Sequence, residues 1–348
     1  MGIYNEQGEA VGAPDTRVIL PKEKLGAHST LGVQRRHHSH SSAHSGCPRK
    51  VLPKEQPLDL VYVVGGWGFD DQTCPVERFC TENNEWRMTA PMIRHRGDAA
   101  VCSLGGLIYT VGGHDEFTCL SSVEKYDPET NLWSGDVAAL SSARSKMSLV
   151  EMEGYLYALG GHDGITCTNI VERYDPSQNT WMKMPSMRTR RSGAAAAVLD
   201  GFLYVMGGSD DDGPINSVER FSPLDGCWIT CPPMQTAREN PGCIVFLGHI
   251  YVAGGRDELL LELSTAERFD PENFRWTPVK RMKSKRYQVS LVVFNGSLLA
   301  VGGFDGITNL KTMELYNHET NSWRHFGSMK SKHPGGHVAL VKTFCNVA

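Results

Sequence analysis

The sequence predicts an all-β protein, a six-bladed β-propeller that follows a disordered N-terminal arm. Three kinds of residue repeat together and support this prediction. Glycine doublets recur every 47 or 48 residues, a tryptophan follows each doublet by 21 or 22 residues, and an aromatic residue precedes each tryptophan by seven. The doublets begin at Gly65, Gly112, Gly160, Gly207, Gly254 and Gly302, and the tryptophans are Trp86, Trp133, Trp181, Trp228, Trp276 and Trp323. Six units of this length without helical periodicity are typical of a propeller.

Each repeat reads as four short strands, as the second repeat illustrates. Residues 98–104 predict a small, apolar first strand, and residues 107–111 predict a buried second strand that ends at the glycine doublet. A polar loop leads to a third strand around 122–126. Turn-forming residues at 127–131 then separate it from a fourth strand that starts near 132. Asp200-Gly201 and Asn295-Gly296 suit two-residue hairpin turns in later repeats.

The two ends of the chain predict how the ring closes. The first repeat begins at its second strand, residues 60–64, and residues 336–341 have the small, apolar character of a first strand. Pairing of these segments would close the ring and remove the open sheet edges. We therefore expect an arm at 1–57, a propeller at 58–343 and a tail at 344–348. The arm includes the polar stretch 35–42, which is unlike a folding segment.

Composition excludes several classes of protein. The chain has 348 residues, a net charge of −4 and no apolar run near the roughly 20 residues that span a membrane. The N-terminal residues lack the apolar core of a signal peptide, so we expect none, and ten cysteines are too sparse for a disulfide scaffold or a zinc site. We expect a reduced, cytoplasmic protein without metal or cofactor. Eight of the 35 Lys/Arg and five of the 39 Asp/Glu lie in the arm, which leaves 27 basic and 34 acidic residues in the propeller. This balance argues against nucleic-acid binding.

The repeated residues have structural interpretations first. The glycine doublets end strands and do not open helices, so they are not phosphate loops. The tryptophans are expected to wedge between blades. A glutamate lies two residues before each repeated aromatic, on the same face of its strand, and is expected to be a structural acid.

Residues without an evident structural role in the repeat are predicted to lie together on one rim of the propeller. A basic residue recurs in each connection between blades, where it either pairs with acids and carbonyls or faces the rim: Arg96, Arg144, Arg191, Arg238, Arg286 and His333. The residues directly after the doublets belong to the same rim, and the first of them, Trp67, is the one tryptophan outside the repeat position. Arginine, histidine and large aromatic residues are enriched in binding hot spots.

The glycine doublet, the Glu-x-aromatic pair and the tryptophan at these spacings resemble the Kelch repeat, and the propeller most resembles those of BTB–Kelch adaptors. That resemblance implies recognition of a peptide segment of a substrate for a cullin-based ubiquitin ligase, with no catalytic residues. A 57-residue arm is too short for BTB and BACK domains, so cullin binding is expected only through domains outside this chain. The resemblance implies a partner-binding rim formed by Trp67, His114, Arg144, His162, Arg191, Ser192, Arg238, Arg256, Tyr287 and Phe304.

Two other functions remain open at this point. Some Kelch propellers bind actin, and nothing in the sequence separates that role from substrate recognition. Others are metal-dependent enzymes, which need converging ligands near one end of the axis. His114 and His162 occupy equivalent loops and are each followed by aspartate, but no third histidine repeats there.

Overall fold

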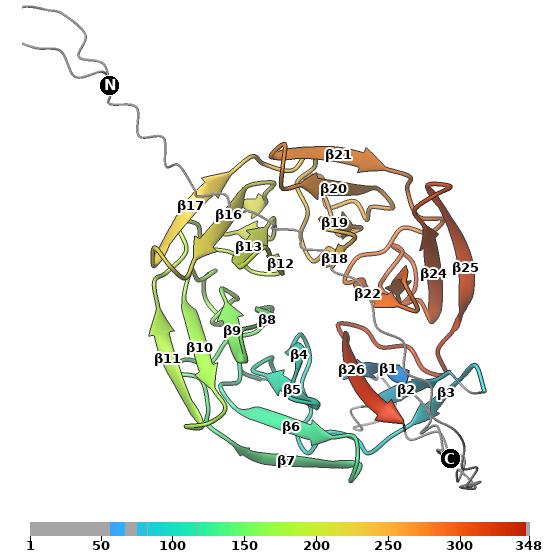
Figure 1. Ribbon diagram of the computed structural model, residues 1–348. Helices are drawn as coiled ribbons and strands as arrows, with labels where there is room; N and C mark the ends of the chain where they lie inside the picture. Colours follow the sequence, from blue (N-terminus) through green and yellow to red (C-terminus); the bar gives the residue numbers. More distant parts are fainter. Residues whose placement is uncertain (1–55, 67–74, 82, 116, 346–348) are drawn as a thin grey trace, which may run out of the picture. The chain divides into compact units, whose positions relative to one another are not determined.

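The computed structural model describes residues 56–66, 75–81, 83–115 and 117–345 (Figure 1). The expected arm therefore lies outside the described residues except for its last two positions. The described residues form strands joined by turns and loops, with no helix among them and hence none long and apolar enough to cross a membrane. The predicted all-β class is confirmed.

Six four-stranded antiparallel sheets form the blades of a ring (Figure 1). From the axis outward, blade 1 is β26 (His337–Cys345), β1 (Gln56–Val64), β2 (Val76–Cys80) and β3 (Glu85–Met88); blade 2 is β4 (Ala100–Leu104), β5 (Leu107–Val111), β6 (Val123–Asp127) and β7 (Leu132–Val137); blade 3 is β8 (Ser148–Met152), β9 (Tyr155–Leu159), β10 (Val171–Asp175) and β11 (Thr180–Met184).

The remaining blades repeat this order, and blade 4 adds a short hairpin between its second and third strands. Blade 4 is β12 (Ala195–Leu199), β13 (Phe202–Met206), β16 (Val218–Ser222) and β17 (Cys227–Cys231), with the hairpin β14 (Ser209–Asp210) and β15 (Gly213–Pro214); blade 5 is β18 (Gly242–Phe246), β19 (His249–Ala253), β20 (Ala266–Asp270) and β21 (Arg275–Val279); blade 6 is β22 (Ser290–Phe294), β23 (Ser297–Val301), β24 (Thr312–Asn317) and β25 (Ser322–Ser328).

The C-terminal strand closes the ring, as predicted. β26 pairs with β1 along nine residues, from Gln56 opposite Cys345 to Val64 opposite His337. This pairing begins two residues before the predicted start of the propeller at 58 and ends two residues after its predicted end at 343. Blade 1 thus combines the two ends of the described sequence.

The repeated tryptophans join neighbouring blades. Trp133 of blade 2 is buried and its Nε1 donates a hydrogen bond to the carbonyl of Ala90, in the connection that follows blade 1, at 2.9 Å. Trp181 makes the same bond to Ala138, one blade further on. Apolar clusters accordingly extend across each interface between neighbouring blades. At the interface between blades 1 and 2, Trp133 packs with residues of β1 and β26. The predicted wedge is confirmed.

Candidate partner-binding face

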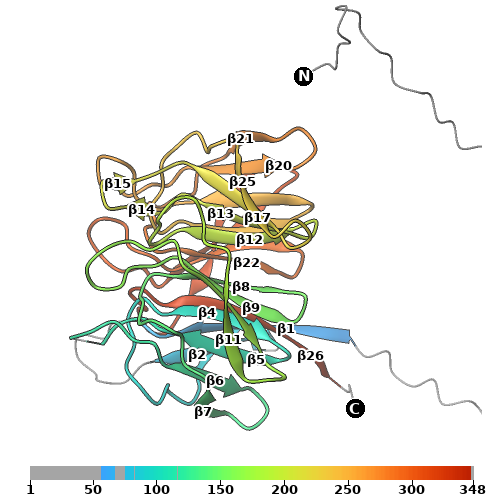
Figure 2. The ribbon, with the colours of Figure 1, turned by 90° about the vertical axis from the view of Figure 1, so that its left-hand side faces the viewer.

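The strand directions place two sets of segments at one end of the ring, which we call the loop face. It consists of the loops after the glycine doublets (114–122, 162–170, 209–217, 256–265 and 304–311) and the connections that lead into each inner strand. Isolated β-bridges join the two sets, for example Ser145 with His162 and Tyr287 with Phe304. The hairpin turns between first and second strands, such as 153–154 and 247–248, lie at the opposite end, the hairpin face. Figure 2 shows the ring from the side, with β14 and β15 on the loop face.

The structure brings most of the predicted rim residues to the loop face but exposes few of them. His114, His162, Arg256 and Phe304 follow the doublets and are half-buried. Ser192 and Tyr287 lie beside this series, in the inter-blade connections, and are buried. Trp67 lies outside the described residues.

Arg144, Arg191 and Arg238 require a correction, because their side chains are no more than 1% exposed and are not on a surface that a partner touches. Each lies inside a blade and pairs with the repeated glutamate. In blade 4, Arg191 Nη2 lies 2.9 Å from Glu219 Oε1, and Nη1 donates to the carbonyls of Gly207 and Ser217. Glu219 also accepts the backbone N–H groups of Arg188 and Thr189, so one carboxylate fixes the whole connection.

The same arrangement explains the first glycine of the doublets in blades 2 to 5. Gly112 has a φ of +61° and its carbonyl accepts a hydrogen bond from Arg96. A β-carbon there would lie 2.4 Å from the carbonyl oxygen of Arg144 in the next connection. A side chain is therefore excluded both by the left-handed backbone and by lack of space. The doublets are structural, as the sequence indicated.

His114 is held by a carboxylate at the mouth of the central channel. Its Nε2 lies 3.2 Å from Asp98 Oδ2, and its Nδ1 lies 3.0 Å from the carbonyl of Asp115. The hydrogen bond to Asp98 raises the pKa of His114, although burial opposes this. Burial would raise the pKa of Asp98, but the His114 hydrogen bond and the charge of Lys146 hold it below its usual range.

A ring of residues with left-handed backbone surrounds this mouth. Equivalent positions in the six connections have φ between 48° and 68°: Asp98, Lys146, Gly193, Asn240, Gln288 and Gly335. Backbone hydrogen bonds link neighbours in this ring, including Lys146 N to Asp98 O at 2.9 Å and Asn240 N to Gly193 O at 2.7 Å. Gln288 Nε2 also donates to Asp98 Oδ1 at 2.8 Å. The mouth of the channel is polar, and backbone groups of neighbouring positions in this ring hydrogen-bond to one another.

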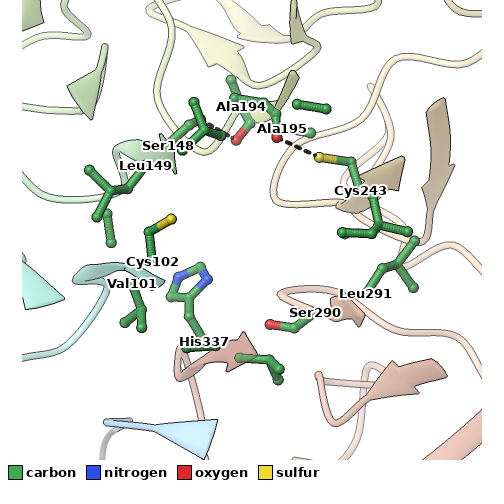
Figure 3. Close-up of a pocket in the computed structure, with 18 of the residues that line it drawn as sticks. Val101, Cys102, Ser148, Leu149, Ala194, Ala195, Cys243, Ser290, Leu291 and His337 are labelled. Carbon is green, nitrogen blue, oxygen red and sulfur yellow. Dashed lines mark hydrogen bonds between the residues drawn. The ribbon is translucent and has the colours of Figure 1, made fainter. Parts of the chain in front are cut away.

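The channel itself has a volume of about 720 Å³ and is lined by the six inner strands. Figure 3 shows Cys102, Cys243 and His337 among small and apolar side chains. Cys243 Sγ lies 3.0 Å from the carbonyl oxygen of Ala196. Burial raises the pKa of both thiols to about 12 and lowers that of His337. These groups are thus neutral near pH 7, and the thiols are poor nucleophiles. No cluster of three or more His, Cys, Asp or Glu side chains suited to a metal occurs within the described ranges.

Several large apolar side chains of the loop face are highly exposed, and the sequence reasoning did not select them. Phe117, Ile165 and Ile307 occupy the same position in three loops and are 88%, 87% and 91% exposed. Leu259 in the blade 5 loop is 77% exposed. A signal was present in the sequence, because each of the first three stands two residues after an aspartate and directly before a threonine.

Aspartates hold these tips outward. Asp163 Oδ1 accepts the N–H groups of Ile165 and Thr166, at 2.8 and 2.9 Å. Asp115 accepts the equivalent bonds from Phe117 and Thr118, and the hydrogen bonds from Thr118 and Phe117 lower its pKa to about 2. Each of these aspartates thus forms the turn of its loop. These hydrogen bonds therefore hold the loops in defined turns that keep the apolar side chains at their tips exposed.

Arg256 and Tyr287 form a second ordered feature of this face. The guanidinium carbon of Arg256 lies 4.1 Å from the centroid of the Tyr287 ring, and Nη2 lies 3.1 Å from Glu262 Oε1. The Tyr287 hydroxyl accepts a hydrogen bond from Asn240 at 2.9 Å. The buried Tyr287 ring thus packs against the guanidinium group of Arg256 and holds it in place, and the Arg256 side chain remains 26% exposed.

Comparisons with known proteins agree with this architecture. Residues 58–255 match the family model described as the KLHDC2/KLHL20/DRC7 Kelch-repeats domain, and residues 237–283 and 285–330 match the Kelch motif. The chain is 42% identical to Kelch-like protein 23 of Mus musculus over 84 residues, which are 24% of this chain and 14% of that protein. It is 42% identical to human Kelch-like protein 4 over 62 residues, 18% of this chain and 9% of that protein. These matches therefore span a small part of either relative.

Among solved structures, the one titled "Structure of YjhT" superposes with a TM-score of 0.68. The match covers 80% of this chain and 99% of that one, at 15% sequence identity. Similarity at this level of identity shows the common fold and nothing further.

Proposed function

Because the chain belongs to the KLHDC2/KLHL20/DRC7 Kelch-repeats domain family, we propose that it is a protein-interaction module whose loop face binds an extended segment of a partner protein. The observation that carries this proposal is the set of exposed apolar tips, Phe117, Ile165 and Ile307, which three blades display at one position. Exposed apolar side chains gathered on one face, with polar groups around them, are characteristic of interaction sites.

The arrangement of this face favours an extended segment over a small molecule. The tips stand on loops around a polar channel mouth, and a rigid ring holds all of these loops. Loops on a rigid scaffold can contact successive side chains of a peptide. The two thiols that line the channel are protonated near pH 7, which makes them poor nucleophiles.

We further propose that this binding serves substrate recognition for a cullin-based ubiquitin ligase. The support is the similarity to the Kelch-like proteins, together with the resemblance of the repeat to BTB–Kelch adaptors. Contact with the cullin is assigned to other domains or subunits. Binding of actin is the alternative, and filament co-sedimentation distinguishes it.

The test compares partners of the full chain with those of a loop-tip variant, Phe117→Ser/Ile165→Ser/Ile307→Ser, in cells with the proteasome blocked. We expect partners to be lost from the variant and the melting temperature to be unchanged, because these side chains are already exposed. Truncation of such anchors weakens binding by about thirtyfold or more. A matched variant, Leu247→Ser, alters a 58% exposed leucine on the hairpin face and should retain every partner. An identical partner set for both variants would contradict the proposal.

A further inference from the structure

The loop of blade 5 differs from its equivalents by one extra residue, which accounts for the 22-residue interval between Gly254 and Trp276. The insertion produces three consecutive leucines at the tip, Leu259, Leu260 and Leu261, that are 77%, 59% and 51% exposed. Asp257 Oδ1 accepts the N–H groups of Leu259 and Leu261, each at 2.9 Å. The loop is therefore ordered with its leucines directed away from the core.

The tip of the blade 6 loop lies beside the blade 5 loop. A β-carbon on Gly306 would lie 2.8 Å from Glu262 Oε2, so the two loops touch at this carboxylate. Ile307, directly after Gly306, is 91% exposed. We call Leu259, Leu260, Leu261 and Ile307 the leucine arc.

Opposite charges lie at the two ends of the leucine arc. On the blade 5 side Glu258 is exposed, whereas Glu262 pairs with Arg256 and lies where the blade 5 and blade 6 loops meet. On the other side Lys332 is exposed, and its Nζ lies 2.6 Å from Thr308 Oγ1 in the blade 6 loop. The arc thus has the carboxylate of Glu258 at one end and the ammonium group of Lys332 at the other.

We propose that the leucine arc docks an amphipathic segment of the partner protein, with apolar side chains between a basic end, placed near Glu258, and an acidic end, placed near Lys332. This inference rests on the function proposed above and specifies its partner. Desolvated apolar anchors supply most of the affinity of such a contact, and charges at its rim select register and orientation. The reverse orientation would bring like charges together, which selects against it.

The test pans a random-peptide phage library against the full chain, and then compares the most enriched peptide with its charge-reversed counterpart. The proteins are wild type, Glu258→Lys, Lys332→Glu and the double variant. We expect peptides with Leu, Ile or Phe between a Lys/Arg end and an Asp/Glu end. Each single change should weaken binding about tenfold at low ionic strength. The double variant should prefer the charge-reversed peptide. Glu153→Lys, on the hairpin face, is the matched control.

The apolar contribution is tested with Leu259→Asn/Leu260→Asn/Leu261→Asn. Leu260 has a φ of +57°, which asparagine tolerates better than leucine, so the melting temperature should not fall. We expect at least a thirtyfold loss of peptide affinity. Leu247→Asn, also at positive φ (+49°) but on the hairpin face, should bind normally.

Two results would overturn this inference and leave the proposed function intact: peptides that need the loop-face tips but show no charge preference, or peptides unaffected by the triple leucine change. A failure of the proposed function would give a different result, because binding of all peptides and partners would then also be unaffected by the changes at Phe117, Ile165 and Ile307.

Discussion

Arg238 has a guanidinium group that is almost fully buried in blade 5. Its Nε lies 3.0 Å from Glu267 Oε1, Nη1 donates to the carbonyls of Gly254 and Thr265, and Nη2 donates to Thr265 Oγ1. Burial lowers the pKa of Arg238, and the charge of Glu267 counteracts this. A buried pair of this kind gains little over an apolar pair, but removal of one partner leaves an uncompensated charge inside the blade.

We therefore expect Arg238→Glu to prevent folding or to lower the free energy of unfolding by about 3–5 kcal/mol or more. The reason is that two carboxylates would face each other without water. Chemical denaturation followed by tryptophan fluorescence measures the change. Arg281→Glu alters an exposed arginine and should change the free energy of unfolding by no more than about 0.5 kcal/mol. Equal denaturation midpoints for the two variants would refute the structural role of Arg238.

His114 and Asp98 predict a dependence of stability on pH. The pKa of His114 is raised in the folded protein, so its contribution is fully present below the ordinary value of 6.5 and is lost as the pH rises through the higher folded value. The pKa of Asp98 is lowered, so its contribution is present above the ordinary value of 3.8 and is lost as the pH falls through the lower folded value.

The melting temperature of His114→Gln should therefore fall below that of the wild type most clearly between about pH 4 and pH 6.5, and the difference should shrink toward pH 9. Differential scanning fluorimetry across this range measures it. A difference that grows with rising pH would show that the His114–Asp98 pair does not stabilise the fold in its charged form.

At the scale of the elements, the sequence predicted strands better than loops. Glycine doublets, hairpin turns and buried tryptophans recur because the same packing is needed in each blade, so their spacing located the blades. The closing strand was found from the missing first strand of the first repeat and the small, apolar residues at 336–341. The extra residue of the blade 5 loop is also visible in the sequence, because the interval from Gly254 to Trp276 is longer than the equivalent interval in the other repeats.

The loop face was less accessible to sequence reasoning, since a repeated residue type does not reveal its exposure. Arginine is a residue type common in binding hot spots, yet three of the predicted residues are buried and pair with a glutamate about 28 positions further along the chain: Arg144, Arg191 and Arg238. Ile165 and Ile307 resemble core residues, yet the preceding aspartates turn them outward. Whether such a side chain is buried depends on which strand end packs against which inter-blade connection. Only the assembled ring determines these contacts.

At the scale of the whole molecule, one antiparallel strand pair joins the ends of the described chain into a ring. β26 lies between the inner strands β22 and β4 and contacts both of them. Its residues Ala339 and Val341 are 3% and 2% exposed and pack with Trp133 of blade 2. In an open repeat array each unit is supported by its neighbours alone, whereas a closed ring has no terminal unit. Loss of β26 packing should therefore weaken blades far from it.

Val341→Asp tests this coupling, because it places an unpaired carboxyl group in the interface between blades 1 and 2. We expect a loss of about 3 kcal/mol or more in the free energy of unfolding. Hydrogen exchange should accelerate in β13 and β16 of blade 4, across the ring, as much as in β1. Lys342→Ala, at the exposed neighbouring position, should leave exchange unchanged everywhere. Acceleration confined to blade 1 and its two neighbours would mean that the blades unfold as separate units, and that closure by β26 stabilises the ring only locally.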